Sequence, residues 1–237
     1  MRLAILETDR QSPDQLPRFG TLTEMMARWL APAVPGLQAT RLDATTLDAT
    51  AFDVSGGLPE PAGFDGAVIT GSRASAYDPE PWIAPLEAWL RAAMQAGTPL
   101  LGVCFGHQIL AQALGGQVAR RGWRVGLTRL HATWPGAVQE PLCGHVWHQD
   151  QVTRPPAGAA VLAAYPGCPL GALGYGRRAL SVQWHPEYPA DYMAAVLAAE
   201  GPACLPDPIH RAATASLTGA HDGPQVAMAA AQYLGWR

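Results

Sequence analysis

Hydrophobic positions in the first half of the chain alternate between short continuous runs and segments with helical spacing. Continuous apolar runs at residues 3–6, 67–70 and 100–103 predict buried β-strands. Between them, apolar residues recur every three or four positions at 22–30 and 82–94, which predicts two amphipathic helices. Such alternation of strands and helices is typical of a parallel sheet that carries helices on both faces.

The pattern changes between Gly116 and Ser181. Apolar stretches become short there, and glycines and prolines separate them. This predicts short strands, some of which pair as antiparallel hairpins. The expected strands span residues 118–120, 126–130, 161–164 and 172–175.

Helical spacing returns in the alanine-rich tail, at residues 192–200, 209–217 and 226–234. We expect these helices to pack on the core, since no low-complexity divide precedes them. The chain is therefore interpreted as one α/β domain, residues 1–190, with a C-terminal helical extension, residues 191–237, packed on the same domain.

Composition is that of an ordinary globular protein. The 237 residues are 49% hydrophobic and carry a net charge of -3. No basic stripe or block of like charge suggests nucleic acid or an anionic membrane surface as a partner. No apolar run approaches the roughly 20 residues of a membrane span, and the N-terminal apolar run is too short for a signal peptide. We therefore expect a cytoplasmic protein.

The chain contains no lysine, and all 16 of its basic residues are arginine. This excludes the lysine of a P-loop and the lysine of a Schiff base, and with them simple ATP-hydrolysing and pyridoxal chemistry. No cofactor is expected. The four cysteines lie far apart in the sequence, which favours free thiols over disulfides in this context.

Cys104 marks the candidate nucleophile. The apolar run at 100–103 ends there, and an amphipathic segment containing Ile109 and Leu110 follows at once. This pattern predicts a strand, a tight turn and a helix. At a helix N-terminus, backbone N–H groups and the helix dipole favour a thiolate over a thiol, so the sulfur is suited to attack a carbonyl carbon.

A candidate base lies far downstream, in the segment Ser181-Val182-Gln183-Trp184-His185-Pro186-Glu187. We interpret it as a short β-type segment, in which residues two apart project to the same side. His185 and Glu187 are spaced in this way. The sequence therefore contains a nucleophile, a base and a group that can orient the base.

The segment Gly-Val-Cys-Phe-Gly-His-Gln at 102–108, followed by Gln-Trp-His-Pro-Glu at 183–187, resembles the signature pair of class I glutamine amidotransferases. The resemblance covers roughly residues 1–190, and the tail lies outside it. It implies a flavodoxin-like fold, with a mixed, mostly parallel sheet and helices on both faces. It further implies a stand-alone enzyme, similar to the amidotransferase domain of GMP synthetase, that releases ammonia from glutamine through a γ-glutamyl thioester.

The resemblance also implies roles for individual residues. Cys104 is the nucleophile, His185 the general acid and base, and Glu187 the group that orients His185. The backbone amides of Gly71 and Phe105 form the oxyanion hole, where fixed N–H donors stabilise the developing charge.

Four further residues are implied to bind the substrate: Gln108, Ser72, Trp147 and His148. Two of these segments depart from the family pattern. Trp147 stands where the family often has a small polar residue, and the loop Thr70-Gly71-Ser72 replaces the more usual double glycine. Both departures concern the substrate and leave the nucleophile in place.

Several other polar residues are open to a structural interpretation. His107 falls on the first turn of the helix after Cys104, and we favour a structural hydrogen bond for it. Cys143, His145 and His148 lack the spacing of a tetrahedral ligand set, so no metal site is expected. Arg73 is equally suited to binding a substrate carboxylate and to lying in solvent.

These observations predict an enzyme that hydrolyses a γ-glutamyl amide bond, with glutamine as the default small-molecule substrate. One alternative is a γ-glutamyl peptidase that acts on a γ-glutamyl conjugate, which the bulk of Trp147 suggests. A second alternative is a subunit that is active only with a synthetase partner that receives the ammonia. The sequence indicates neither the acceptor of the ammonia nor the oligomeric state.

Overall fold

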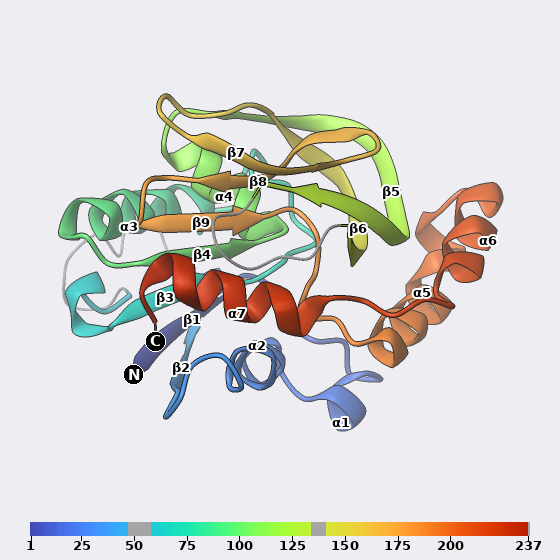
Figure 1. The fold of residues 1–237 in the computed structure, drawn as a ribbon, viewed down its shortest axis with the longest axis horizontal. Coiled ribbons are helices and arrows are strands. Elements are labelled where there is room, and N and C mark those ends of the chain that lie inside the picture. The colour runs from blue at the N-terminus through green and yellow to red at the C-terminus, as the bar shows by residue number, and fades with distance from the viewer. Residues whose placement is uncertain (47–57, 134–140, 237) are drawn as a thin grey trace.

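The computed structural model describes residues 1–46, 58–133 and 141–236. Within them, the strands form one nine-stranded sheet in the order β2-β1-β3-β4-β9-β8-β7-β5-β6 (Figure 1). In chain order the strands are β1 (Arg2–Glu7), β2 (Gln38–Asp43), β3 (Gly66–Ile69), β4 (Leu100–Val103), β5 (Gln117–Ala132), β6 (Leu142–Arg154), β7 (Ala160–Tyr165), β8 (Cys168–Gly174) and β9 (Ala179–Val182).

Helices cover both faces of this sheet (Figure 1). On one face α2 and α7 pack in one apolar cluster with strand residues such as Val68 and Leu101. On the other face α3 and α4 pack against residues such as Ile69 and Leu100. The helices are α1 (Leu16–Phe19), α2 (Leu22–Leu30), α3 (Ile83–Ala96), α4 (Phe105–Ala113), α5 (Ala190–Cys204), α6 (Asp207–Ser216) and α7 (Gly223–Leu234), with 3₁₀ turns at Ala44–Thr46 and Pro61–Gly63.

The sheet has a parallel half and an antiparallel half. β2, β1, β3, β4 and β9 pair in parallel, whereas β8, β7, β5 and β6 continue the sheet through antiparallel pairs. Every residue of β3, β4 and β9 is buried, as expected for strands covered by helices on both faces. The predicted flavodoxin-like sheet with helices on both faces is thus confirmed.

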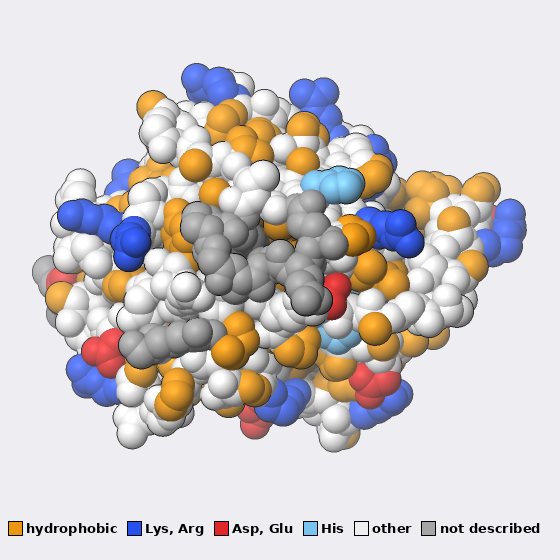
Figure 2. All heavy atoms as spheres, in the orientation of Figure 1, with side chains coloured by type: hydrophobic (Ala, Val, Ile, Leu, Met, Phe, Trp, Pro, Cys, Tyr) orange, Lys and Arg blue, Asp and Glu red, His pale blue; other side chains and the backbone are white. Residues whose placement is uncertain are grey.

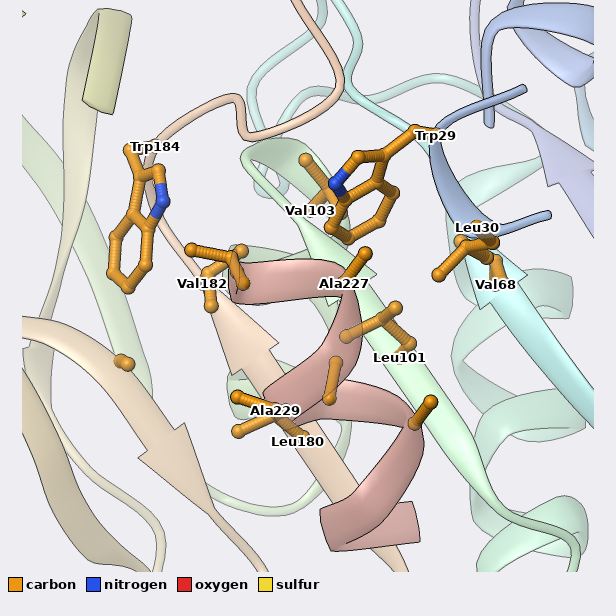
Figure 3. Close-up of a cluster of buried hydrophobic side chains, with 14 of the residues drawn as sticks. Trp29, Leu30, Val68, Leu101, Val103, Leu180, Val182, Trp184, Ala227 and Ala229 are labelled. Carbon is orange, nitrogen blue, oxygen red and sulfur yellow. The ribbon is translucent and has the colours of Figure 1, made fainter. Parts of the chain in front are cut away.

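The last helix packs closely on the parallel half. α7 lies across β4 and β9, with Ala227 and Ala229 turned toward Leu101 and Leu180 (Figure 3). These small side chains allow the helix to approach the sheet. Trp29 of α2 borders the same cluster, and its indole Nε1 donates to the carbonyl of Gly223 at 2.8 Å.

The structure differs from the sequence predictions at three places. Between 116 and 181, where the pattern predicts only short strands, β5 has 16 residues and β6 has 13. The pattern does not predict β2, since this edge strand is mostly polar and half-exposed. The strand before the His-Pro-Glu segment ends at Val182, so His185 and Glu187 lie beyond it, and only His185 makes an isolated bridge, to His145.

The surface carries basic and acidic side chains that are scattered rather than gathered on the face shown in Figure 2. Among the described residues, no helix combines the length and the apolar character needed to cross a bilayer.

Candidate active site

Cys104 occupies a tight turn between β4 and α4. It is the one non-glycine residue of the described ranges with a positive φ, with φ 52° and ψ -102°. Glycines on either side make this turn feasible, because a Cβ at Gly102 would collide with the carbonyl of Gly106, and one at Gly106 with the carbonyl of Ile69. A strained, over-determined backbone of this kind is typical of functional sites. The predicted strand, turn and helix are therefore present.

His185 and Glu187 meet as the sequence predicts, although they lie in a loop and not in a strand. His185 Nδ1 lies 2.8 Å from Glu187 Oε1, and both side chains are buried. The His185 ring also stacks on Tyr188, with centroids 4.0 Å apart and an interplanar angle of 12°. The carboxylate and the stacked ring together fix the orientation of the imidazole.

The electrostatics of His185 favour the imidazolium. Burial alone lowers its pKa, but the charges of Cys104 and Glu187 and hydrogen bonds to both side chains outweigh burial and raise the pKa to about 10. A histidine that carries a proton beside a cysteine is the arrangement from which an ion pair forms. The structure thus brings Cys104, His185 and Glu187 together electrostatically as well as spatially.

Gly71 lies directly against this group. A Cβ at position 71 would lie 2.9 Å from His185 Cε1 and 3.7 Å from Cys104 Cβ. Glycine is therefore required by the close approach of the loop to the histidine. Among the described residues, no hydrogen bond uses the backbone N–H of Gly71 or of Phe105, the first residue of α4. Both donors are available to a ligand, as an oxyanion hole requires.

A buried pair of threonines holds the Gly71 loop. The Thr8 backbone N–H donates to Thr70 Oγ1 at 3.0 Å, and the two hydroxyls lie 3.0 Å apart. The Thr8 hydroxyl also lies within 3.0 Å of the Gly71 carbonyl. The Gly106 N–H donates to the Thr70 carbonyl at 3.1 Å, which links this loop to the first turn of α4. These bonds fix Gly71 relative to Cys104.

Two glutamines connect Cys104 to the wall of the site. Gln183 Nε2 donates to Cys104 Sγ at 3.8 Å, and its Oε1 accepts from Gln108 Nε2 at 3.2 Å. Gln108 Nε2 also donates to the carbonyl of Asp150 at 2.9 Å. The Cys104 thiol in turn points to the carbonyl of Trp147 at 3.8 Å. β6 therefore lies directly beside the sulfur.

β6 contributes a buried histidine and a buried carboxylate. His148 uses both ring nitrogens within the protein, with the Asp150 carbonyl at 3.0 Å and the Tyr165 hydroxyl at 2.7 Å. Asp150 accepts from the Ser75 hydroxyl through Oδ2, whereas its buried Oδ1 has no partner among the described residues. An unpaired buried carboxylate oxygen is costly, so Asp150 is suited to receive a donor from a ligand.

One cavity of about 320 Å³ joins these groups. It is lined by Cys104 and His185 and by the sequence-predicted residues Gly71, Ser72, Gln108, Trp147 and His148. Glu187 and Phe105 do not line the cavity. Glu187 contacts His185, and Phe105 directly follows Cys104 in the turn. A cavity of this size is at the small end of the range of ligand pockets.

The structure also locates the residues for which the sequence predicts a structural role or leaves the role open. Arg73 lines the cavity but pairs with Asp9 at 3.2 Å and with Glu200 at 3.8 Å. His107 is fully buried beside Ser181 Oγ at 2.8 Å, and burial lowers its pKa to about 3. The four cysteines are free, and no group of three potential ligand residues within the described ranges is arranged to hold a metal ion.

The sequence pattern does not identify several site residues, chiefly Thr8, Asp150, Gln183 and Tyr188. Thr8 directly follows a buried strand, as Thr70 does, and this shared position at the carboxyl end of neighbouring strands is the available signal. Asp150 and Gln183 adjoin residues of the recognised motifs. No sequence signal places Tyr188 against the face of His185.

The chain belongs to the class I glutamine amidotransferase family, because the model described as "Glutamine amidotransferase class-I" matches residues 39–197. Membership of this family implies an enzyme of the cysteine hydrolase type. The tail beyond residue 197 and the first strand lie outside the match.

Curated relatives point to two kinds of enzyme. The chain is 41% identical over 127 residues to a GMP synthase [glutamine-hydrolyzing] of Parafrankia sp.. The aligned stretch covers 51% of this chain and 23% of the relative. It is 35% identical over 136 residues to gamma-glutamyl peptidase 5 of Arabidopsis thaliana, covering 53% of this chain and 54% of the relative. The chain thus matches about a quarter of the first relative and about half of the second.

Solved structures share the fold along the whole chain. A glutamine amidotransferase from Methylobacillus flagellatus superposes with a TM-score of 0.68 at 22% identity, covering 100% of this chain and 94% of that one. A glutamine amidotransferase from Thermotoga maritima gives a TM-score of 0.70 at 20% identity, covering 98% and 95%. At these identities the likeness establishes the fold alone.

Proposed function

We propose that this protein hydrolyses the amide bond of γ-glutamyl compounds through a Cys104 thioester, with glutamine as the reference substrate. The observation that carries the proposal is the contact of a strained, cavity-lining cysteine with a histidine whose pKa is raised to about 10. An imidazolium supported by Glu187 both favours the thiolate and supplies a proton to a leaving group.

In the first half of the reaction, Cys104 Sγ attacks the amide carbon and the carbonyl π electrons move to oxygen. The N–H groups of Gly71 and Phe105 bind this oxyanion. The oxyanion then re-forms the carbonyl, the C–N bond breaks, and His185 gives its Nε2 proton to the departing nitrogen. The products of this half are an amine, or ammonia from glutamine, and the γ-glutamyl thioester.

In the second half, a water molecule attacks the thioester carbon and His185, now neutral, takes one of its protons. The C–S bond of the resulting intermediate breaks, which returns the thiolate, leaves His185 as the imidazolium and releases the γ-carboxylic acid, whose remaining proton passes to the solvent. Glu187 stabilises the imidazolium at both stages, since it remains hydrogen-bonded to Nδ1.

Recognition of the γ-glutamyl amino acid is assigned to the wall formed by α4 and β6. Asp150 Oδ1 is buried without a partner among the described residues, so it is suited to accept from the α-ammonium of the substrate. Gln108 and Ser72 line the same cavity and supply neutral polar groups. Trp147 and the backbone of His148 complete this wall.

Replacing the nucleophile tests the proposal. We expect Cys104→Ser to abolish the release of glutamate from glutamine and from γ-glutamyl amides, while Cys143→Ser, at a half-buried cysteine outside the cavity, retains it. Full hydrolysis by Cys104→Ser would contradict the mechanism.

A γ-glutamyl peptidase is the second candidate function. Trp123 and Trp147 both line the cavity and give it an aromatic surface that a primary amide does not need. The 35% identity to gamma-glutamyl peptidase 5 supports the same alternative. Turnover of glutamine compared with γ-glutamyl dipeptides separates the two functions.

Dependence on a synthetase partner is a third proposal, supported by the GMP synthase relative. The large apolar side chains exposed within the described residues are those of Leu16, Tyr77, Val161 and Met228, and none of them lines the cavity. Activity of the isolated chain would decide against such dependence. A cytoplasmic location also stays a proposal, supported by the free cysteines.

A further inference from the structure

We propose that the cavity contains a leaving-group subsite for an uncharged, apolar or aromatic amine, so that the preferred substrates are γ-glutamyl amides of such amines and not glutamine. The subsite consists of Gln11, Leu22, Tyr188, Tyr192 and Val196, which all line the cavity. The inference rests on the proposed function, because it assumes that the γ-glutamyl carbonyl lies at Cys104.

The position of His185 decides on which side the leaving group lies. The nitrogen that departs must lie beside the histidine that protonates it. Tyr188 stacks on His185 with ring centroids 4.0 Å apart, and Tyr192 meets Tyr188 edge-on at 4.5 Å. A substituent on the departing nitrogen therefore extends toward these rings, away from Asp150 and Gln108.

The subsite continues into an apolar cluster. Tyr192 and Val196 of α5 pack there with Phe19 and Met25, and Leu22 and Tyr188 border them. The polar atoms in this region are already used, since the Tyr192 hydroxyl donates to Gln11 Oε1 at 2.9 Å and Gln11 Nε2 to Met25 Sδ at 3.5 Å. When glutamine is bound, its small amide nitrogen would not cover this apolar surface, which would stay in contact with water.

Charges next to the subsite favour an uncharged amine. Arg73 is paired with Asp9 and Glu200, and Arg10 is paired with Asp43 at 3.1 Å. The third arginine that lines the cavity, Arg120, lies opposite Asp150 in the β5–β6 ladder, on the wall assigned to the γ-glutamyl amino acid. On the side of the subsite, a carboxylate on the leaving group, such as that of a γ-glutamyl dipeptide, would therefore have to compete with these carboxylates for an arginine. An amine that carries only an apolar group gains burial without that cost.

Two residues of the subsite lie outside the family match. Gln11 and Leu22 lie outside the stretch that matches the family model, residues 39–197. They reach the cavity because the loop after β1 and the start of α2 lie beside α5, with Phe19 and Tyr192 in edge-on contact at 4.9 Å. The part of this wall formed by Gln11 and Leu22 therefore does not follow from the family match.

The test compares three substrates on the wild-type protein: glutamine, γ-glutamyl-benzylamide and γ-glutamyl-phenylalanine. We expect the benzylamide to have the highest kcat/KM, by about tenfold or more over glutamine, which is the discrimination that a small apolar contact in a pocket provides. We expect the phenylalanine conjugate, which adds a carboxylate and one further carbon, to fall below the benzylamide.

A pair of variants locates the effect. Leu22→Trp fills the subsite and should lower the ratio of benzylamide to glutamine kcat/KM about tenfold. Leu16→Trp makes the same change at an exposed leucine that does not line the cavity, and it should leave the ratio unchanged. Since each ratio is measured on one protein, partial misfolding cancels.

Outcomes separate this inference from the proposed function. Hydrolysis of glutamine equal to or better than that of the benzylamide overturns the subsite and leaves the proposed function intact. If the wild type hydrolyses none of the three, the proposed function fails. Calorimetric binding to Cys104→Ser then still decides on the subsite, which requires tighter binding of the benzylamide than of glutamine.

Discussion

The two halves of the sheet differ in how they are built and in what they contribute. Strands β3, β4 and β9 of the parallel half are short and buried at every position. β5 and β6 of the antiparallel half are long; β5 is partly exposed along most of its length, whereas most positions of β6 are buried. The parallel half carries Cys104, Gly71 and the loop to His185 at the carboxyl ends of its strands. The antiparallel half supplies the wall with Trp147 and Asp150.

This difference indicates a division between reactivity and recognition. Groups at the ends of fully buried strands are held by packing on both faces, which suits atoms that must be fixed within fractions of an ångström. The β5–β6 hairpin is less completely buried than these strands, and such a segment tolerates more changes of side chain, which suits a wall that selects the substrate. Substitutions at Glu187 and Gly71, beside Cys104, should therefore lower kcat, and those in the β6 wall should raise KM.

The largest effect is expected at Glu187. Glu187→Gln removes the charge that supports the His185 imidazolium, and we expect kcat for glutamine to fall about a thousandfold or more with little change in KM. Steady-state kinetics measure both values. Glu60→Gln, at an exposed position, is the matched control. A loss confined to KM would remove the distinction between the halves.

A smaller but still large effect is expected at Gly71. In Gly71→Ala the new methyl group would lie 2.9 Å from His185 Cε1, so the histidine or the oxyanion loop must move. We expect kcat to fall about a hundredfold, as for the loss of one oxyanion donor. Gly63→Ala, where no atom lies within 4 Å of the added carbon, should keep full activity.

The antiparallel half is tested at Asp150. Asp150→Asn removes the negative charge that is assigned to the substrate α-ammonium, and we expect KM to rise about tenfold while kcat changes less. Exposed Asp207 provides the control, as Asp207→Asn. If Asp150→Asn lowered kcat at unchanged KM, β6 would belong to the reactive machinery.

The last prediction concerns stability in acid and not activity, since both halves contain a buried neutral histidine. Burial lowers the pKa of His107, on α4, and of His148, on β6, to about 3 each. An unfolded histidine titrates near 6.5, so the unfolded state binds more protons below that pH. Stability is therefore present above about pH 6.5 and is lost as the pH falls toward 3.

Each of these histidines should contribute about 1.4 kcal/mol per pH unit to that loss. Urea unfolding of His107→Gln and His148→Gln between about pH 6 and pH 4 measures the slope. We expect each variant to be less stable at neutral pH but less sensitive to acid. An unchanged slope in either variant would show that its histidine is protonated in the folded protein.

The difference between the two halves of the sheet also explains which features can be predicted from the sequence. Continuous apolar runs identify β1, β3 and β4, and glycines around Cys104 identify the turn, because burial on both faces and a positive φ each restrict the residues allowed. The sequence predicts the pairing of His185 with Glu187 through a strand, but that strand ends earlier, at Val182. Their contact nevertheless forms, since the loop after β9 places His185 beside Cys104 and keeps Glu187 Oε1 2.8 Å from His185 Nδ1.

Other features depend on contacts between distant segments. β5 and β6 carry few continuous apolar runs, so their length follows from pairing with each other and not from local pattern. Leu22 reaches α5 only through tertiary packing. Tyr188 reaches His185 through a local turn, in which the Tyr188 N–H donates to the His185 carbonyl at 3.4 Å. The residues of the leaving-group subsite could therefore not be assembled from the sequence.

The most direct test of the central claim is covalent labelling with a chloroketone analogue of glutamine, followed by peptide mass spectrometry. We expect loss of activity in proportion to a single adduct on Cys104, slowed by excess substrate and much reduced in His185→Ala. Inactivation with the adduct on Cys143, Cys168 or Cys204, and none on Cys104, would contradict it.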